Sequence, residues 1–174
     1  VLKGKYLINA DSEAEGVLWT SSAGGLTSTC EIPINRQKGK GLKVNIAVSD
    51  LQGGHSGSEI DKNRTNATRL MGRFLFELRD YVNYGLIDMM GGLKDNAIPR
   101  DSTANIIINP ADADKLKIGF EELKKKYKNE LISSEPNLEM QMMDLGEGEY
   151  SYIHPVSFEK VLFMLINTPN GVQK

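Results

Sequence analysis

The chain has 174 residues and a mass of 19.3 kDa, and 40% of its residues are hydrophobic, which suits one globular domain that needs no metal or disulfide to fold. The formal net charge is −2, and basic residues are scattered apart from Lys124–Lys126, so we expect no nucleic-acid partner. Cys30 is the only cysteine, which excludes an internal disulfide, and no apolar run approaches a membrane span or a signal-peptide core. We therefore expect no membrane partner and a cytoplasmic setting.

Both ends of the chain suggest a piece of a longer protein. The chain starts with Val1 instead of methionine and runs almost at once into the strand-like segment 6–9. It stops soon after Asn167–Gly171. We therefore expect further residues, outside this sequence, to complete the molecule.

The first third of the chain contains segments with the character of strands. Segments 16–21 and 26–34 are each expected to be a strand. Residues 42–50 alternate apolar with polar or small side chains, which is the period of two expected of a half-buried strand. This third strand leads directly toward His55.

Helical periodicity dominates the segment that follows. Apolar residues recur at intervals of three and four from 63 to 84, which predicts an amphipathic helix that Asp61 or Asn63 could cap and Gly85 ends. The remaining expected elements are strands at 86–90, 104–109 and 138–145, a second helix that starts near Asn109–Asp112 and keeps its period to Leu131, and a closing helix at 156–166.

From residue 42 to residue 145 the order of elements is therefore β-α-β-β-α-β. This order is typical of the ferredoxin-like, split βαβ motif, an antiparallel sheet of four strands with two helices on one face. We predict an α+β fold of this class, with extra N-terminal strands and a C-terminal helix.

The strongest candidate for chemistry is Gly53-Gly54-His55-Ser56-Gly57, which lies between the strand and the helix. Glycines on both sides of His55 remove side-chain bulk, permit positive φ and let a ligand or another chain approach the backbone. The chain has only two histidines, and the other, His154, precedes Pro155 and is expected to lie at the entry of the closing helix. From these residues alone, His55 could equally be a turn histidine with an ordinary hydrogen bond.

Several segments together resemble one family. They are, in chain order, Leu7–Glu13, Gly53–Gly57 with its helix, Gly91–Arg100 and Asn167–Val172. In this order they resemble the Xaa-His dipeptidases, which are the aminoacylhistidine dipeptidases among the M20 di-zinc metallopeptidases. The resemblance covers nearly the whole chain.

The resemblance implies a division of labour within a larger enzyme. Residues 1–16 would end the first segment of a catalytic domain, and residues 17–174 would form the first part of an inserted lid, or dimerisation, domain. Asp11 would be the one zinc ligand on this chain, because the family's other ligands have no counterpart here. The parent enzyme would hold two zinc ions and cleave dipeptides of the Xaa-His type, whereas this chain alone would hold no di-zinc centre and be inactive.

The same resemblance implies roles for residues near His55. His55 would donate a ring N–H to the developing oxyanion in the active site of the other subunit of a homodimer. Asn96 would donate its amide to the substrate carboxylate or to the same tetrahedral centre, while Gly91 and Gly92 would keep their loop close to the cleft. Without the resemblance, Asp11 and Asn96 would be ordinary turn residues.

A second class of function fits the same pattern of elements. A ferredoxin-like sheet with a glycine-rich loop before a helix could be a non-catalytic module that binds a small anion at the helix N-terminus and dimerises through a sheet edge. The two hypotheses differ in whether His55 takes part in turnover.

Overall fold

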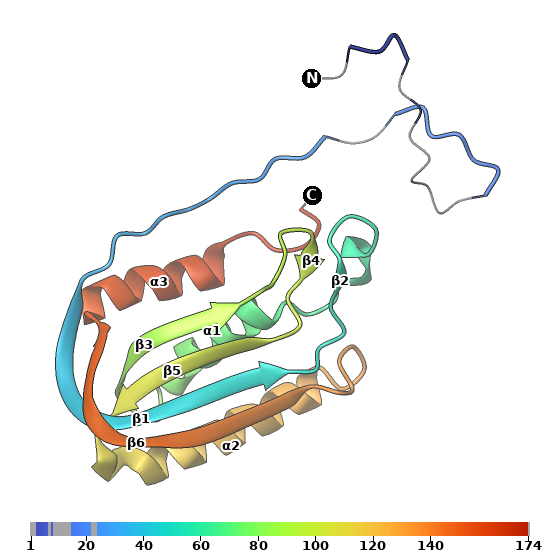
Figure 1. The fold of residues 1–174 in the computed structure, drawn as a ribbon. Helices are drawn as coiled ribbons and strands as arrows, with labels where there is room; N and C mark the ends of the chain where they lie inside the picture. The colour runs from blue at the N-terminus through green and yellow to red at the C-terminus, as the bar shows by residue number, and fades with distance from the viewer. Residues whose placement is uncertain (1–2, 7, 9–14, 22–23, 174) are drawn as a thin grey trace. The chain divides into compact units, whose positions relative to one another are not determined.

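The structure is a computed structural model that describes residues 3–6, 8, 15–21 and 24–173 (Figure 1). The chain divides into two compact units, Val1–Cys30 and Glu31–Lys174. The described residues of the first unit form no helix or strand. Within the parts of the chain that are described, no helix is both long and apolar enough to cross a membrane.

The second unit contains the predicted order of strands and helices. Its elements are β1 (Arg36–Ser49), β2 (Gly54–His55), the 3-10 helix η1 (Ile60–Lys62), α1 (Ala67–Leu78), β3 (Tyr84–Gly91), β4 (Ala97–Ile98), β5 (Ser102–Ile108), the 3-10 helix η2 (Pro110–Asp112), α2 (Ala113–Glu130), β6 (Glu139–Ile153) and α3 (Pro155–Asn167). Strands β3-β5-β1-β6 form an antiparallel sheet in that order, and β2 pairs with β4 in a separate ribbon. The ferredoxin-like prediction is confirmed, and β1 lies inside the sheet with its end directed toward β2, the short strand that contains His55 (Figure 1).

The two extra strands expected at the N-terminal end are not found. The described residues of 16–21 and 26–34 lie outside any strand, and β1 begins only at Arg36, where the chain first pairs with Ile153. An extended sequence becomes a strand only where its backbone N–H and C=O groups find a partner. These segments have the composition of strands, but within the described chain their backbone has no neighbouring strand to pair with.

The first helix is shorter than its periodicity suggests. The helix begins at Ala67, and its cap is Asn66, whose side chain accepts from the N–H groups of Thr68 and Arg69. Neither predicted cap has this role, because Asp61 lies in η1 and Asn63 has a left-handed backbone with φ 51°. The helix also ends at Leu78, so Gly85 belongs to β3 instead of ending α1.

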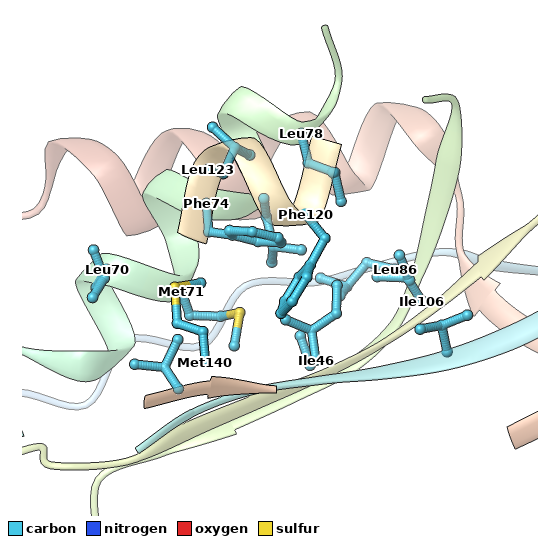
Figure 2. Close-up of a cluster of buried hydrophobic side chains, with 14 of the residues drawn as sticks. Ile46, Leu70, Met71, Phe74, Leu78, Leu86, Ile106, Phe120, Leu123 and Met140 are labelled. Atoms are coloured by element: carbon cyan, nitrogen blue, oxygen red, sulfur yellow. The ribbon is translucent and has the colours of Figure 1, made fainter. Parts of the chain in front are cut away.

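The core lies between the sheet and the two helices α1 and α2 (Figure 2). Alternate residues of β1 and β5 point into it, and both helices contribute their apolar stripes, as the periods of two and 3.6 require. Its fully buried members include Ile46, Met71, Phe74, Leu78, Leu86, Ile106 and Met140. The Phe74 ring meets that of Phe120 edge to face, with centroids 5.9 Å apart, which joins α1 to α2.

Helix α3 packs beside α1 and β3, as expected of a closing helix (Figure 1). Close approach of α1 and α3 depends on Gly72, because a Cβ at this position would lie 2.7 Å from Cβ of Leu165. The N-terminus of α3 is capped by His154, whose Nδ1 accepts from the Val156 N–H at 3.3 Å. The helix-entry role predicted for His154 is confirmed.

We expect Phe74→Ala to destabilise the protein by about 3–5 kcal/mol, because it removes a buried ring and leaves a cavity. Phe76→Ala is the matched control, since Phe76 lies on the same helix and is 46% exposed. Urea denaturation would measure both free energies of unfolding. Equal losses for the two variants would contradict this description of the core.

Candidate active-site cavity

Residues 51–66, within the segment between β1 and α1, carry His55 and are called the His55 loop below. It is joined to the 96–100 segment by backbone hydrogen bonds, from Leu51 N–H to Arg100 O at 3.4 Å and from Ser56 N–H to Asn96 O at 3.0 Å. Between them, β2 pairs with β4, with His55 opposite Ala97. His55 and Asn96, which are far apart in the sequence, are therefore brought together by a short antiparallel ribbon.

Two glycines before His55 are required by the fold of the loop. Gly53 has φ 61° and Gly54 has φ 142°, in the region that disfavours side chains. A Cβ at Gly53 would collide with Cγ of Arg100, and one at Gly54 would lie 2.6 Å from Oε2 of Glu59. The groups that lie close to these two glycines in the structure are side chains of the same chain.

The imidazole of His55 is exposed, and its orientation is fixed by its own turn. Its Nδ1 accepts from the backbone N–H groups of Gly57 at 3.0 Å and Ser58 at 3.3 Å. In the neutral ring, an Nδ1 that accepts leaves the proton on Nε2. His55 therefore presents Nε2–H as a donor toward groups outside the loop.

The backbone of His55 is held by a carboxylate four residues further on. Oε2 of Glu59 accepts from the His55 N–H at 2.9 Å, while Oε1 of Glu59 pairs with Arg64 at 2.8 Å and with Lys62 at 2.9 Å. Arg64 in turn donates to the carbonyl of Gly53. The pKa of the Glu59 carboxyl is lowered to about 2, first by the His55 N–H, then by the hydrogen bond from Lys62 and the charge of Arg64.

A cavity of about 680 Å³ opens beside the β2–β4 ribbon, at the ends of β3 and β5. It is lined by every candidate site residue of the described chain, namely His55, Gly91, Gly92 and Asn96. Its volume is in the range of small-molecule sites. A second hollow, of about 750 Å³ along α3, contains none of these residues and is mainly apolar in its lining side chains.

Gly91 and Gly92 are each required by the local structure, for different reasons. A Cβ at Gly91 would lie 2.5 Å from Oγ1 of Thr68 and 2.9 Å from Oγ of Ser102, so β3 can end against α1 only with glycine there. Gly92 has φ 76°, which turns the chain out of the strand. Asn96 follows at the far side of this turn and is exposed at the cavity.

Sequence reasoning assigned no role to two cationic residues of the same cavity, Lys94 and Arg100. Arg100 donates from Nε to the carbonyl of Leu51 at 2.9 Å, which ties it to the start of the His55 loop. Both residues lie within the Gly91–Arg100 motif, and this position is the one feature of the sequence that could have predicted their place at the cavity.

The predicted metal ligand, Asp11, lies outside the described residues. In the part of the chain that the structure describes, no three His, Cys, Asp or Glu side chains gather as a metal site would require. These residues therefore do not fit a zinc centre of their own.

The anion-binding alternative finds little support at the N-terminus of α1. The first N–H groups of the helix are all used within the chain: that of Ala67 by Pro99, those of Thr68 and Arg69 by the Asn66 side chain, and that of Leu70 by the Asn66 carbonyl. A small anion binds a helix N-terminus through free N–H groups. Here no such group remains in the first turn.

The chain is an α+β domain of the ferredoxin-like class, with a histidine-bearing ribbon at one end of its sheet. Comparison with known proteins identifies the family. Residues 41–135 match the M20 peptidase dimerisation domain. The chain is also 34% identical over 173 residues to the cytosol non-specific dipeptidase of Escherichia coli (strain K12), a match that covers 98% of this chain. The chain belongs to the M20 peptidase dimerisation domain family, whose relatives are hydrolases.

A solved structure has the same fold. The aminoacylhistidine dipeptidase of Vibrio alginolyticus superposes with a TM-score of 0.72 and 24% identity, over 80% of this chain and 30% of that protein. This chain likewise spans only 36% of the length of the E. coli dipeptidase. It therefore corresponds to about a third of each of these relatives.

We predict that the Glu59 carboxyl titrates near pH 2, well below the ordinary value of 4.5. Since its pKa is lower in the folded than in the unfolded chain, the ionised group stabilises the His55 loop fully above about pH 4.5 and loses this effect as the pH falls toward 2. Carbon-13 NMR of the Glu59 side chain would measure the midpoint. A midpoint near 4.5 would contradict the hydrogen bonds described here.

Proposed function

We propose that this chain is the lid and dimerisation part of a cytoplasmic zinc dipeptidase that hydrolyses Xaa-His dipeptides. Residues 1–16 would end the first segment of its catalytic domain, and residues 17–174 would belong to the lid. The proposal is carried by one observation: His55, Asn96, Gly91 and Gly92 line a single cavity. The dipeptidase relationship supports the reaction class, and the Xaa-His preference rests on the family resemblance of the sequence motifs.

The geometry supports a transition-state role for His55. Hydrolysis of a peptide bond develops negative charge on the former carbonyl oxygen, and a fixed donor stabilises that charge more than the neutral carbonyl. With Nδ1 occupied by Gly57 and Ser58, the Nε2–H of His55 is oriented before substrate arrives. His55 would donate this proton in a hydrogen bond without transferring it.

Asn96 would orient the substrate next to His55. Its side-chain amide can donate to the substrate carboxylate or to the same tetrahedral centre. The zinc ligands of the enzyme other than Asp11, together with its general-base glutamate, would lie outside this chain. We therefore expect the isolated chain to be inactive.

The parent enzyme would be a homodimer in which His55 reaches the active site of the other subunit. Membership of a dimerisation family supports the homodimer. An exposed His55, fixed on its Nδ1 side and open on its Nε2 side, supports action on a group brought by another part of the assembly. Such sites are built only when two copies associate.

In the complete enzyme, we expect His55→Ala to lower kcat by about 10²–10³-fold, the usual loss when one oxyanion donor is removed. Zinc content and dimer mass should not change, because His55 is neither a ligand nor part of the core. His154→Ala is the matched control and should leave kcat unaltered, since His154 only caps α3. Unchanged turnover in the His55 variant would reject the proposal.

Mixing experiments would test whether His55 acts across the dimer. We expect inactive His55→Ala subunits, mixed with subunits inactivated at a zinc ligand outside this chain, to recover up to about a quarter of the wild-type activity, because half the dimers become hybrids with one intact site. Activity assays after subunit exchange would measure this. No recovery, with hybrids verified by mass spectrometry, would place His55 in its own subunit's site.

A further inference from the structure

Both ends of the His55 loop are anchored by one buried carboxylate. Glu135, in the connection between α2 and β6, is only 2% exposed. Its Oε2 accepts from the backbone N–H of Gln52 at 2.7 Å, and its Oε1 accepts from the backbone N–H of Thr65 at 2.9 Å. Gln52 lies just after β1 and Thr65 just before the cap of α1, so the carboxylate bridges the two points where the loop leaves the core.

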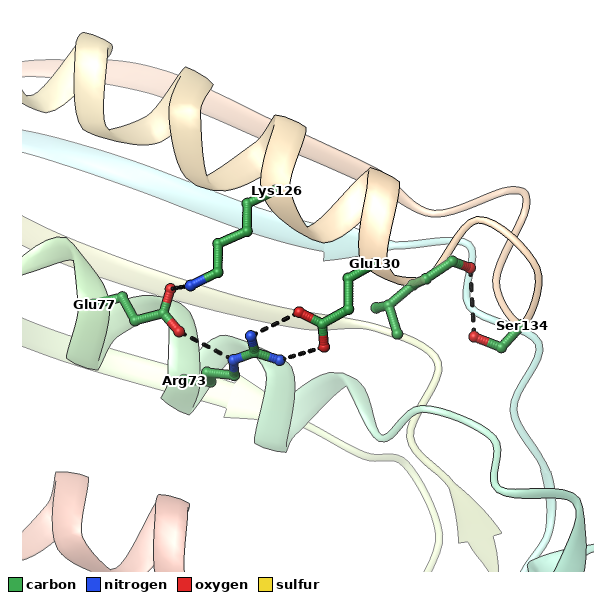
Figure 3. Close-up of polar contacts among 6 residues, drawn as sticks. Arg73, Glu77, Lys126, Glu130 and Ser134 are labelled. Carbon is green, nitrogen blue, oxygen red and sulfur yellow. Dashed lines mark hydrogen bonds and ion pairs between the residues drawn. The ribbon is translucent and has the colours of Figure 1, made fainter.

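The Glu135 backbone is itself held on the framework of the domain. Its backbone N–H donates to the carbonyl of Leu131 at 2.7 Å, and the neighbouring Ser134 carbonyl accepts from the Gln52 side chain at 2.6 Å. The end of α2 is fixed to α1 because Arg73 binds both carboxylate oxygens of Glu130, at 2.6 and 2.7 Å (Figure 3). Glu135 therefore starts from a rigid turn.

Glu135 has no cation to neutralise it among the described residues. No Lys, Arg or His side chain of this part of the chain lies within ion-pair distance of its carboxylate, in contrast to Glu59, Glu77 and Glu130. A buried carboxylate without a counterion is unfavourable unless its oxygens are hydrogen-bonded. Here the two N–H groups of the loop supply these hydrogen bonds, so the carboxylate stabilises the loop in the position where both bonds form.

We propose that Glu135 is a positioning residue for His55. By anchoring both ends of the His55 loop, Glu135 fixes the position of the loop relative to the Asn96 side of the cavity. This inference rests on the proposed catalytic role of His55. Glu135 does not touch the cavity, so it acts only through the loop that it closes. A small displacement of a catalytic donor is enough to lower turnover strongly.

The test uses Glu135→Gln in the complete enzyme. A glutamine keeps the shape of the side chain but turns one acceptor into an NH₂ group, which faces a backbone N–H, so one anchor is lost. We expect kcat to fall by about tenfold to hundredfold while KM changes by less than about twofold. Glu121→Gln, at an exposed position of α2, is the control and should behave as wild type.

A double-mutant cycle separates positioning from general damage. If Glu135 acts through His55, Glu135→Gln should cost nothing further in a His55→Ala background. An equal loss in both backgrounds, or no loss in the wild-type background, would overturn the inference. Failure of the proposed function is distinguishable, because His55→Ala alone would then leave turnover unchanged.

A measurement without turnover covers the case in which the glutamine variant is too unstable to assay. Glu135→Asp keeps the charge but shortens the side chain by one methylene, so it should release one end of the loop. Hydrogen-exchange NMR of the 174-residue chain would then be expected to show faster exchange of the Ser56 N–H, which bonds the Asn96 carbonyl and so reports the place of the loop against that side of the cavity. A Ser56 N–H that exchanges at the wild-type rate in the Asp variant would contradict the positioning role.

Discussion

The placement of His55 depends on how a loop of backbone is anchored where it leaves the sheet and where it enters the helix. A loop of this length would otherwise sample many conformations, at a cost in entropy for each residue that must be ordered. Two carboxylates order it: Glu135 closes its ends, and Glu59 holds the His55 N–H within it. The hydrophobic core packs β1 and α1, the two elements that the loop connects, against one another.

This anchoring explains why the site lies at the end of a strand and not on a free loop. Strand β1 is paired on both sides, by β5 and by β6, so its last residues cannot move independently of the sheet. The β2–β4 ribbon then joins His55 to the segment of Asn96. Functional side chains presented by a rigid scaffold in this way keep their geometry before substrate arrives.

Periodicity was sufficient to predict the main sheet and its two covering helices, because alternation and 3.6-residue spacing report directly which face is buried. It failed where a partner decides the structure. Segments 16–21 and 26–34 have the composition of strands but no strand to pair with in the described part of the chain. Helix α1 begins only at Ala67, because the preceding Thr65 N–H bonds to Glu135. The motif around His55 was visible in the sequence, whereas Glu135 was not, since its partners lie 83 and 70 positions away.

A crystal structure of the complete enzyme with a phosphinate analogue of the tetrahedral intermediate would show whether His55 contacts the reacting group across the dimer. We expect Nε2 of His55 from one subunit to lie within about 2.7–3.1 Å of a phosphinate oxygen in the active site of the other. The Nδ1 contacts with Gly57 and Ser58 should be retained. A His55 ring that remains in solvent while the analogue is fully bound would reject the proposed transition-state role of His55.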